Sequence, residues 1–519
     1  MLSSADRLKF ASQNQVVPPV PLICPTKGWN TRDALDAMDP ADAVQLDNWF
    51  PDASGVYIRN GFTPFASGVG TTAVETLAEY SAGGTDKLLA ASSGNIWDIS
   101  TGTPSSLASG FTNDGWQTVN FLANTFFFNG SDDAQVYNGS TVTTANFSGG
   151  STPNLNTLVG GIIYQNRLYT WQNNSTGFWY ALLNSISGAL AFYDLSAFSP
   201  HGGNLIASAT YSHDGGNGVL DFVCFIMSSG DCLIYYGNDP SDINNWQLIG
   251  IYRISPPVSP RAVCNYGAEA FLTTFDDHVP LQQQLVALKD GALPPRSKVS
   301  TAVQQAVQAN ANGFGWQALY YPQARSLIFN IPNTDGTFDQ HVQNTGLSYT
   351  DPLTGLVTSP WCRFVNWNFV TFGLYKNNLY GGGAGGMVYQ CDVGTLDNLG
   401  AISAVGQQSW NMFQNPQRKH VTAARPIVQS ATGVTYQFGV GFDYGDIDIE
   451  TTGATTGSSS PWNTSPWNTS PWSPESTVST LWHASGGTGV AVSCAISIDA
   501  TDGATWLRSD FRFEQGDYL

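Results

Sequence analysis

Charged residues are scarce in this chain of 519 residues: Lys, Arg, Asp and Glu together make up 11%, against about 25% in an average globular protein. Basic residues are the scarcer kind, with 20 against 39 acidic ones and a formal net charge of −19. This balance argues against a protein that reads DNA through a broad basic face. The 13% of aromatic residues argue against disorder over most of the chain. With 54 glycines and a polar surface made mainly of uncharged side chains, the composition is β-rich.

Signals for export, membrane insertion and metal binding are also missing. The first residues lack the apolar run of a signal peptide, and no stretch approaches the about 20 apolar residues of a membrane span. The six histidines are isolated, with no HExxH motif, so we expect no metal or cofactor. The cysteines are odd in number, are scattered along the chain and never form a CxxC motif. This predicts buried thiols in a protein made in a reducing cytoplasm. The cysteines are Cys24, Cys224, Cys232, Cys264, Cys362, Cys391 and Cys494.

One local pattern recurs along the chain: an apolar run, a turn rich in Gly or Asn, and a second apolar run, as in a β-hairpin. Equivalent apolar residues of successive hairpins lie 38 to 56 residues apart. A repeat of about 40–55 residues with several short strands has the size of a β-propeller blade. We therefore predict an all-β fold with an irregular propeller of six or seven blades; a β-sandwich is the alternative. The hairpins are expected at 87–99, 125–137, 167–182, 221–236, 269–281, 325–340 and 377–390.

Two short helices interrupt this pattern. Asp39-Pro40 looks like an N-cap followed by proline at the first helical position, which predicts a brief helix through Leu46. Between residues 298 and 311, Val299 and Val303 recur on one helical face with Ala306 and Val307, flanked by glutamines. That spacing predicts an amphipathic helix packed on the rim of the propeller.

Changes in composition divide the chain into four parts. We expect an unanchored arm over 1–25, a segment over 26–70 that joins platform and propeller, the propeller over 71–399 and a β-rich platform domain over 400–519. The last part contains the repeat PWNTSPWNTSPWSP at 461–474. Proline at every fifth residue excludes a helix or a central strand there, and the tryptophans predict that the repeat lies across another surface.

The densest acidic segment is FDYGDIDIE, which begins at Phe442. Its Asp446, Asp448 and Glu450 alternate with two isoleucines, and Asp443 precedes them. On a strand, a period of two places the three alternating carboxylates on one face. A solvated face is one interpretation, and a Ca²⁺ site is a second, although the spacing is not that of an EF-hand loop.

Six segments, taken together and in order, resemble the tail nozzle (tail tubular protein B-like) proteins of short-tailed bacteriophages and their prophages. They cover much of the chain, and their shared order is more specific than any one of them. Before the WCRF element this chain carries extra residues (GLSYTDPL), which predicts a longer surface loop. The segments are 28–62, 313–332 (GFGWQALYYPQARSLIFNIP), 360–368 (PWCRFVNWN), 377–394 (NNLYGGGAGGMVYQCDVG), 417–428 (QRKHVTAARPIV) and the PWNTS repeat.

The resemblance implies a non-enzymatic component of the virion tail. Such subunits form a ring, expected to be a homohexamer, that binds the head–tail adaptor and conducts double-stranded phage DNA without reading its sequence. Tail fibres or tailspikes would be further partners. In this setting the acidic segment has a third interpretation, as a channel lining made of Asp443, Asp446, Asp448 and Glu450. The basic residues Arg418, Lys419 and Arg425 would contact a neighbouring subunit or the adaptor, or form a solvated cluster.

Two other classes of function stay open. A propeller glycosidase would need two carboxylates about 5–10 Å apart beneath aromatic residues. The segment SIDATDGATW resembles a sialidase Asp-box, but three residues rather than one separate Asp499 from Gly503, and the motif occurs once. A glycan- or receptor-binding tail protein would use exposed aromatic residues, whereas Trp97, Trp171 and Trp179 lie in apolar runs that predict core packing.

Overall fold

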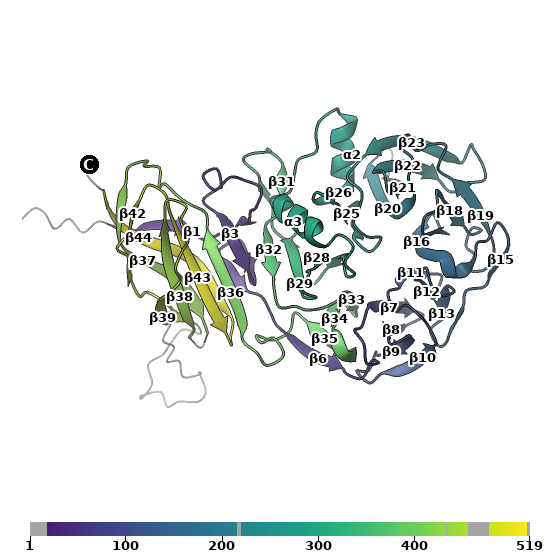
Figure 1. Ribbon diagram of the computed structural model, residues 1–519, viewed down its shortest axis with the longest axis horizontal. Coiled ribbons are helices and arrows are strands. Elements are labelled where there is room, and N and C mark those ends of the chain that lie inside the picture. The colour runs from purple at the N-terminus through teal and green to yellow at the C-terminus, as the bar shows by residue number, and fades with distance from the viewer. Residues whose placement is uncertain (1–17, 215–218, 432, 455–476, 516–519) are drawn as a thin grey trace, which may run out of the picture. The chain divides into compact units, whose positions relative to one another are not determined.

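The structure is a computed structural model that describes residues 18–214, 219–431, 433–454 and 477–515 (Figure 1). The chain folds into two compact units: unit 1 comprises residues 1–59 and 400–519, and unit 2 comprises residues 60–399. Unit 2 thus ends where we expected the propeller to end. The expected joining segment is divided, because 26–59 belong to unit 1 and 60–70 to unit 2. The PWNTS repeat lies outside the described residues.

Unit 2 is a six-bladed β-propeller, and Figure 1 shows its blades arranged in a ring that faces the viewer. The first blade consists of β6 (Phe62–Ala66), β33 (Thr371–Tyr375), β34 (Asn378–Gly382) and β35 (Val388–Cys391). The second holds β7 (Thr76–Ala82), β8 (Thr85–Ser92), β9 (Asn95–Asp98) and β10 (Ser105–Ser109). The third holds β11 (Gln117–Phe121), β12 (Asn124–Phe128), β13 (Gln135–Tyr137) and β14 (Val142–Thr144).

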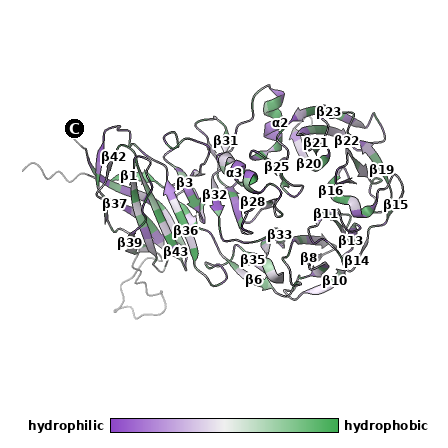
Figure 2. Cartoon of the chain, in the orientation of Figure 1, coloured by the Kyte–Doolittle hydropathy of each residue, from purple (hydrophilic) through white to green (hydrophobic). Residues whose placement is uncertain are grey.

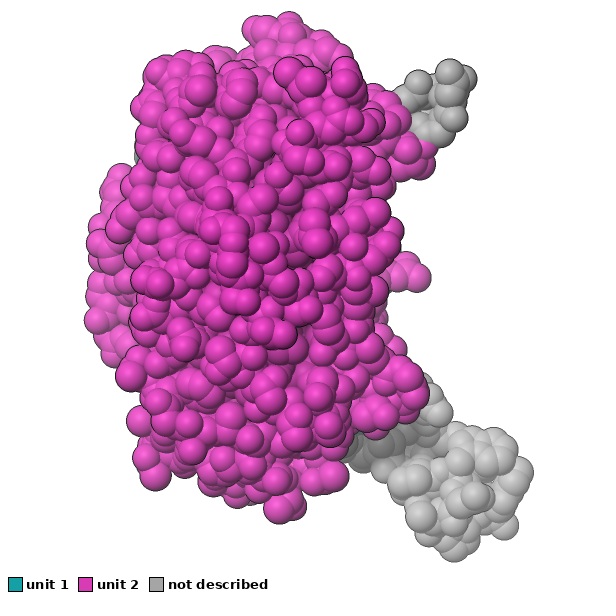
Figure 3. Space-filling view, turned by 90° about the vertical axis from the view of Figure 1, so that its right-hand side faces the viewer, with its two compact units in different colours: residues 1–59, 400–519 teal, residues 60–399 magenta. Residues whose placement is uncertain are grey.

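The fourth blade has five strands, β15 (Phe147–Gly150), β16 (Leu158–Tyr164), β17 (Arg167–Gln172), β18 (Gly177–Tyr180) and β19 (Gly188–Asp194). The fifth has β20 (Leu205–Asp214), β21 (Val219–Met227), β22 (Asp231–Gly237) and β23 (Trp246–Arg253). The sixth has β24 (Val263–Tyr266), β25 (Glu269–Thr273) and β26 (His278–Pro280). Figure 3 shows the flank of unit 2 on which β15 and β19 lie.

An additional group of strands completes the ring. It consists of β27 (Gln317–Tyr321), β28 (Ser326–Pro332), β29 (Phe338–Asn344) and β32 (Trp361–Phe364), paired in that order. Strand β27 contacts β24 on one side and β33 on the other, while the inner strands β33, β7, β11, β16 and β20 follow one another around the ring. In the first blade, β6 pairs with β35, which comes more than 300 residues later. This pairing closes the ring and protects strand edges that would otherwise be exposed.

The expected hairpins are confirmed. Each of the seven segments forms an antiparallel pair: β8–β9, β12–β13, β17–β18, β21–β22, β25–β26, β28–β29 and β34–β35. Hydrophobic and hydrophilic residues alternate along many of these strands (Figure 2). The extra residues before β32 form a small hairpin of β30 (Tyr349–Thr350) and β31 (Val357–Thr358), in which Leu353 is 71% exposed. The predicted surface loop is therefore a hairpin.

Neighbouring blades are held together by aromatic residues. Between the fourth and fifth blades, the rings of Phe178 and Phe225 stack at 4.3 Å, and Tyr169 stacks on Trp246 at 5.9 Å. Trp171 and Trp179, expected in the core, are 1% and 9% exposed, whereas Trp97, also expected there, is half-buried. Because each blade buries one face against the next, the aromatic content noted in the sequence is used mainly for packing.

The amphipathic helix is confirmed as α3 (Ser300–Asn310), with Val303 and Val307 buried. A second helix, α2 (Leu281–Lys289), was not expected. The carboxylate of Glu269 accepts hydrogen bonds from the first backbone N–H groups of this helix. Its oxygen Oε1 lies 2.6 Å from the nitrogen of Gln282. Because this acceptor comes from β25 and not from the residues next to the helix, the local sequence carried no capping signal. Within the described ranges the chain also forms two single 3₁₀ turns, η1 (Leu155–Thr157) and η2 (Ala384–Gly386).

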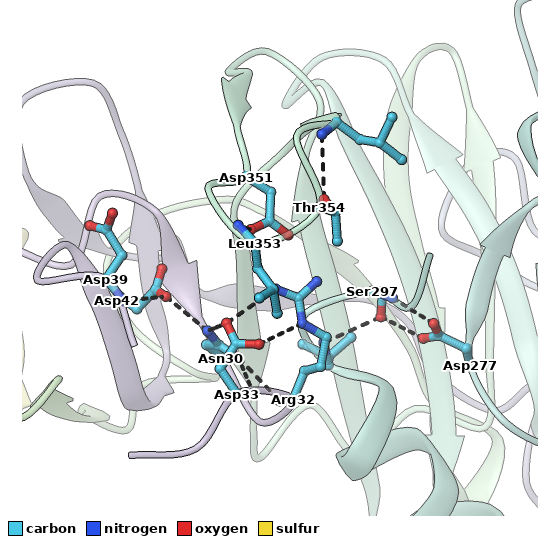
Figure 4. Close-up of polar contacts among 12 residues, drawn as sticks. Asn30, Arg32, Asp33, Asp39, Asp42, Asp277, Ser297, Asp351, Leu353 and Thr354 are labelled. Carbon is cyan, nitrogen blue, oxygen red and sulfur yellow. Dashed lines mark hydrogen bonds and ion pairs between the residues drawn. The ribbon is translucent and has the colours of Figure 1, made fainter. Parts of the chain in front are cut away.

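The helix expected over 39–46 is wrong. Asp39 does accept a hydrogen bond from the backbone nitrogen of Ala41 at 2.9 Å, as an N-cap would, but the chain makes only a turn. From Asp42 onward it is strand β3 (Asp42–Asp47), paired with β36 (Ile402–Gln408). The side chain of Asn30 donates to Asp33 and Asp42, each at 2.8 Å, and fixes this turn (Figure 4). Pairing with a strand 360 residues away overrides the local helix signal.

Unit 1 contains two β-sheets. One is formed by β1 (Val20–Ile23), β4 (Trp49–Pro51), β5 (Val56–Ile58), β37 (Lys419–Ser430), β40 (Thr477–Val478), β41 (His483–Ala484), β42 (Thr488–Gly489) and β44 (Ala504–Gln515). The other runs in the order β2 (Gly28–Trp29), β3, β36, β43 (Val492–Ala500), β38 (Thr435–Phe442) and β39 (Thr451–Ala454).

These two sheets share a core around Trp49 and Trp506, whose ring centroids are 6.1 Å apart. A Cβ at Gly406 of β36 would lie 3.0 Å from the ring of Trp506, so glycine allows the facing sheet to approach. Residues 20–23 belonged to the expected unanchored arm, but they form β1 and pair with β44. All seven cysteines are free thiols; six are buried, as predicted, and Cys264 is half-buried. No helix among the described residues is long and apolar enough to cross a membrane.

Candidate functional site

The acidic segment lies in unit 1, between β38 and β39. After β38 the chain reverses at Asp443 and Tyr444, both with positive φ angles of 49° and 65°. Residues 446–450 then run back without strand pairing, so the predicted strand is wrong. The predicted alternation of faces is nevertheless present: Asp446, Asp448 and Glu450 are exposed, whereas the two intervening isoleucines are half-buried.

Glycines in β38 allow the acidic segment to lie close to the sheet. A Cβ at Gly439 would come within 2.2 Å of the backbone oxygen of Asp448, and one at Gly441 within 2.6 Å of the side chain of Ile447. Only glycine tolerates these approaches, so Ile447 can pack against the strand. Packing of Ile447 holds the neighbouring carboxylates outward, where they form a row of three solvated negative charges.

Asp443 differs from the other three acidic candidates. Its carboxylate oxygen Oδ1 accepts hydrogen bonds from the backbone nitrogens of Val490 at 2.7 Å and Ala491 at 3.1 Å. The backbone nitrogen of Asp443 donates to the oxygen of Ala491 at 2.9 Å. Asp443 thus joins the turn after β38 to the residues that precede β43, and its carboxylate is used inside the chain.

Lys419, the first residue of β37, is fully buried. Its ammonium group donates hydrogen bonds to the backbone oxygens of Asn415, Gln417 and Val490. Burial lowers the pKa of Lys419, and the negative charge of Asp443 opposes that effect. The structure therefore brings Lys419 and Asp443 together at Val490, although the sequence suggested separate roles for them.

Arg425 is held by an ion pair across two strands. On β37 it lies opposite Asp510 of β44, and its Nε and Nη2 atoms are each 2.9 Å from Oδ2 of that carboxylate. Asp510 is 2% exposed, and its other oxygen accepts from Arg508 at 3.0 Å. The guanidinium of Arg425 also stacks on the ring of Trp482 at 4.5 Å.

Arg418 is the exposed member of the basic candidates. It directly precedes β37, and its side chain makes no ion pair with a described residue. Three acidic residues and this arginine are therefore the candidates that present charge to solvent. Asp443, Lys419 and Arg425 have bonding partners within their own chain, a distinction that required contacts far apart in the sequence.

Unit 2 contains a serine, an aspartate and a histidine that meet at one point. Ser199 donates to Asp231 at 2.7 Å, and Nδ1 of His201 lies 2.7 Å from the other oxygen of that carboxylate. Burial tends to raise the pKa of Asp231, but the hydrogen bonds from Ser199 and His201 outweigh it and hold the pKa below its usual value. Because the serine donates to the carboxylate and not to the imidazole, the group is not arranged as a nucleophile with its base.

Two buried histidines form a second polar cluster of unit 2. Nε2 of His278 lies 3.0 Å from Nδ1 of His341. Burial lowers the pKa of both imidazoles, that of His341 to about 3, so both are neutral at pH 7. Nearby, the carboxylate of Asp277 accepts from the backbone nitrogen and hydroxyl of Ser297, at 2.6 and 2.5 Å (Figure 4). The two histidines and Asp277 are enclosed by the fold and are buried from solvent.

A metal site needs several ligands that converge on one point. No group of three His, Cys, Asp or Glu side chains there lies close enough together to hold an ion. The alternating carboxylates Asp446, Asp448 and Glu450 do not converge on a point, as ligands of Ca²⁺ would.

Comparisons with known proteins identify no family. No family model matches the chain, and no curated protein matches it in sequence. Among solved structures, the computationally designed Ika8 protein is similar over 67% of this chain and 96% of its own length, with 10% identity and a TM-score of 0.34. PorZ, a bacterial surface component of the type-IX secretion system of Porphyromonas gingivalis, is similar over 69% of this chain and 44% of its own, with 13% identity and a TM-score of 0.35.

Proposed function

We propose that this protein is a structural subunit of a tail nozzle of a short-tailed bacteriophage, located in the virion tail and without catalytic activity. The observation that carries the proposal is the shared order of the six resembling segments, from residue 28 to the PWNTS repeat. A propeller unit and a separate β-sheet unit are the two bodies that such a subunit needs. In the proposed assembly, six copies form a ring on the head–tail adaptor, and the phage DNA passes through the channel.

The charge of the chain supports a conduit for DNA. Duplex DNA carries one negative charge per about 1.7 Å, and a basic wall would bind it by releasing counterions. Six chains at −19 would carry −114, and a wall of this sign repels the duplex. The repulsion acts within a Debye length of about 8 Å in physiological salt. It would keep the DNA away from the wall, so that the polymer slides without adhering.

In this proposal the exposed carboxylates Asp446, Asp448 and Glu450 line the channel. They are solvated, and the half-buried isoleucines between them hold them on one face. Asp443 would act indirectly, by holding the turn at which the segment starts. Arg418 would contact a neighbouring copy or the adaptor, and a contact of this kind is weakened by salt.

The test is the assembly state of the full-length chain, purified with its head–tail adaptor. Native mass spectrometry gives the number of copies, and cryo-electron microscopy shows whether they enclose an axial channel. We expect sixfold rings on the adaptor, with a bore of negative potential. A particle in which the chain sits singly at the periphery of the tail, or a ring whose bore is mainly positive, would refute the proposal.

A further inference from the structure

A polar pocket lies between the fourth and fifth blades of unit 2. It is formed by the turn that joins β16 to β17 and by the loop that joins β22 to β23. Its volume is about 240 Å³, below the about 300–1,000 Å³ of sites for drug-sized molecules. That size suits one or two small rings. The lining residues are Gln165, Tyr236, Gly237, Asn238, Asn244, Asn245 and Gln247.

The walls of the pocket are held by the fold. Gln165 has a positive φ of 46° in the tight turn between β16 and β17. On the other wall, a Cβ at Gly237 would lie 1.8 Å from the backbone oxygen of Asn245, so only glycine permits this shape. Asp242 accepts hydrogen bonds from the side-chain amides of Asn244 at 3.2 Å and Asn245 at 2.5 Å. The pocket is therefore preformed, which lowers the cost of ordering it around a ligand.

Three side-chain amides of the pocket have unused hydrogen-bonding capacity. Those of Gln165, Asn238 and Gln247 are exposed, and none bonds to a described residue. Each carboxamide offers two donors and an acceptor. A sugar hydroxyl also donates and accepts, so an array of amides is complementary to a row of hydroxyls. The ring of Tyr236, 39% exposed, adds an apolar surface against which a sugar ring can pack.

The nearby charges are already neutralised or used. Arg167 pairs with Asp239 at 3.5 Å. Asp242 accepts hydrogen bonds from Asn244 and Asn245 within the loop between β22 and β23. No lining residue is charged. A ligand with a formal charge would therefore find no counterion, and a negative one would be repelled by the two aspartates. We propose that this pocket binds a neutral saccharide residue, and that unit 2 thereby holds a glycan ligand, a property separate from ring assembly.

A second pocket of similar size provides a matched control. It has a volume of about 230 Å³ and is lined by residues that include Asn120 and Asn124. Here the amides are already bonded: Asn120 donates to the backbone oxygen of Glu79 at 2.9 Å, and Asn124 to that of Leu122 at 2.7 Å. This second pocket has a similar volume, but its asparagine side chains are already hydrogen-bonded, so it should not bind sugar.

Saturation-transfer difference NMR on the full-length chain tests the proposal. The probes are methyl α-D-glucopyranoside, methyl β-D-galactopyranoside and methyl N-acetyl-β-D-glucosaminide, with glucuronic acid as the charged comparator. At about 10 mM, even a Kd of about 1 mM gives high occupancy. We expect transfer to at least one neutral glycoside and weaker transfer to glucuronic acid. Asn238→Asp and Gln247→Ala should each weaken binding about threefold to tenfold, the loss expected from one neutral hydrogen bond.

The control variant is Asn124→Ala, which should bind like the unmodified chain. Circular dichroism and thermal unfolding establish that each variant is folded; the substituted side chains are exposed at Asn238 and Gln247 and half-buried at Asn124. The inference is overturned if none of the three neutral glycosides receives saturation. It is also overturned if binding persists in Asn238→Asp and Gln247→Ala at the strength found for Asn124→Ala.

Discussion

Replacing Arg425 by methionine tests whether its ion pair with Asp510 stabilises unit 1. Methionine keeps an apolar side chain beside Trp482 but removes the guanidinium. Asp510 is 2% exposed and would then rely on Arg508, whose side chain is 53% exposed. A buried carboxylate that loses its main partner is poorly solvated, so the folded state should lose stability.

The expected size follows from the burial of the two partners. Removing one member of a buried pair costs about 3–5 kcal/mol. Because Arg425 is partly exposed and Asp510 keeps Arg508, we expect the lower end, about 3 kcal/mol. Two exposed arginines provide matched controls. Arg508→Met should cost about 0–1 kcal/mol, as for other surface pairs, and Arg418→Met should leave stability unchanged.

Hydrogen–deuterium exchange is the suitable assay, because it reports local opening and needs no two-state unfolding of a chain with two units. A loss of about 3 kcal/mol corresponds to roughly a hundredfold faster exchange of the amides of β37 and β44. Amides of unit 2 in the same sample serve as the internal reference.

The reasoning would be refuted by equal exchange in Arg425→Met and Arg508→Met. It would also be refuted if Arg425→Met left exchange in β37 and β44 unchanged but abolished binding to the adaptor. In that case Arg425 would act at an interface and the ion pair would contribute little to folding.

Three further predictions concern other parts of the chain. Gly439→Ala should disturb the acidic segment, because the new Cβ would meet the oxygen of Asp448, and exchange over 446–450 should increase. Replacing Asp446, Asp448 and Glu450 by their amides should leave stability within about 0.5 kcal/mol but cause assembled rings to retain duplex DNA at low salt. Burial raises the pKa of Asp277 to about 6. Between pH 4 and 6 the folded state then holds a proton that the unfolded state lacks, so the free energy of unfolding falls as pH rises through this range, by about 2 kcal/mol.

Each of these has a control. For the acidic segment it is a triple amide variant at exposed carboxylates elsewhere, with the same change in charge: Asp52→Asn, Asp290→Asn and Asp499→Asn. Equal DNA retention by both triple variants would contradict a channel role. For Asp277, the fall in unfolding free energy between pH 4 and 6 should disappear in Asp277→Asn, and an unchanged pH profile would contradict the assigned pKa. Gly486→Ala, where a Cβ has open space, should leave exchange over 446–450 unaffected; the glycine argument fails if Gly439→Ala does the same.

The hairpins and the helix α3 could be read from the sequence, because both depend on neighbours. A turn of Gly or Asn between two apolar runs brings adjacent strands together, and the spacing of Val299, Val303 and Val307 defines one helical face. Where the acceptor or partner strand lies elsewhere, the same reasoning fails. The turn at Asp39 carries a helix signal and still leads into β3, and α2 is capped by Glu269 from another strand.

The candidate site likewise combines features set by neighbouring residues with features set by contacts between distant parts of the chain. Alternation alone placed Asp446, Asp448 and Glu450 on one exposed face, since side chains of extended backbone alternate whether or not a sheet forms. Composition likewise determined that the chain is acidic and β-rich, and the recurring order of apolar runs and turns determined that it is built from repeated hairpins. Only the tertiary structure could show that Lys419 and Asp443 meet at Val490, 71 and 47 residues away. Long-range hydrogen bonds of this kind depend on how strands are ordered in a sheet, and no local pattern of residues carries that order.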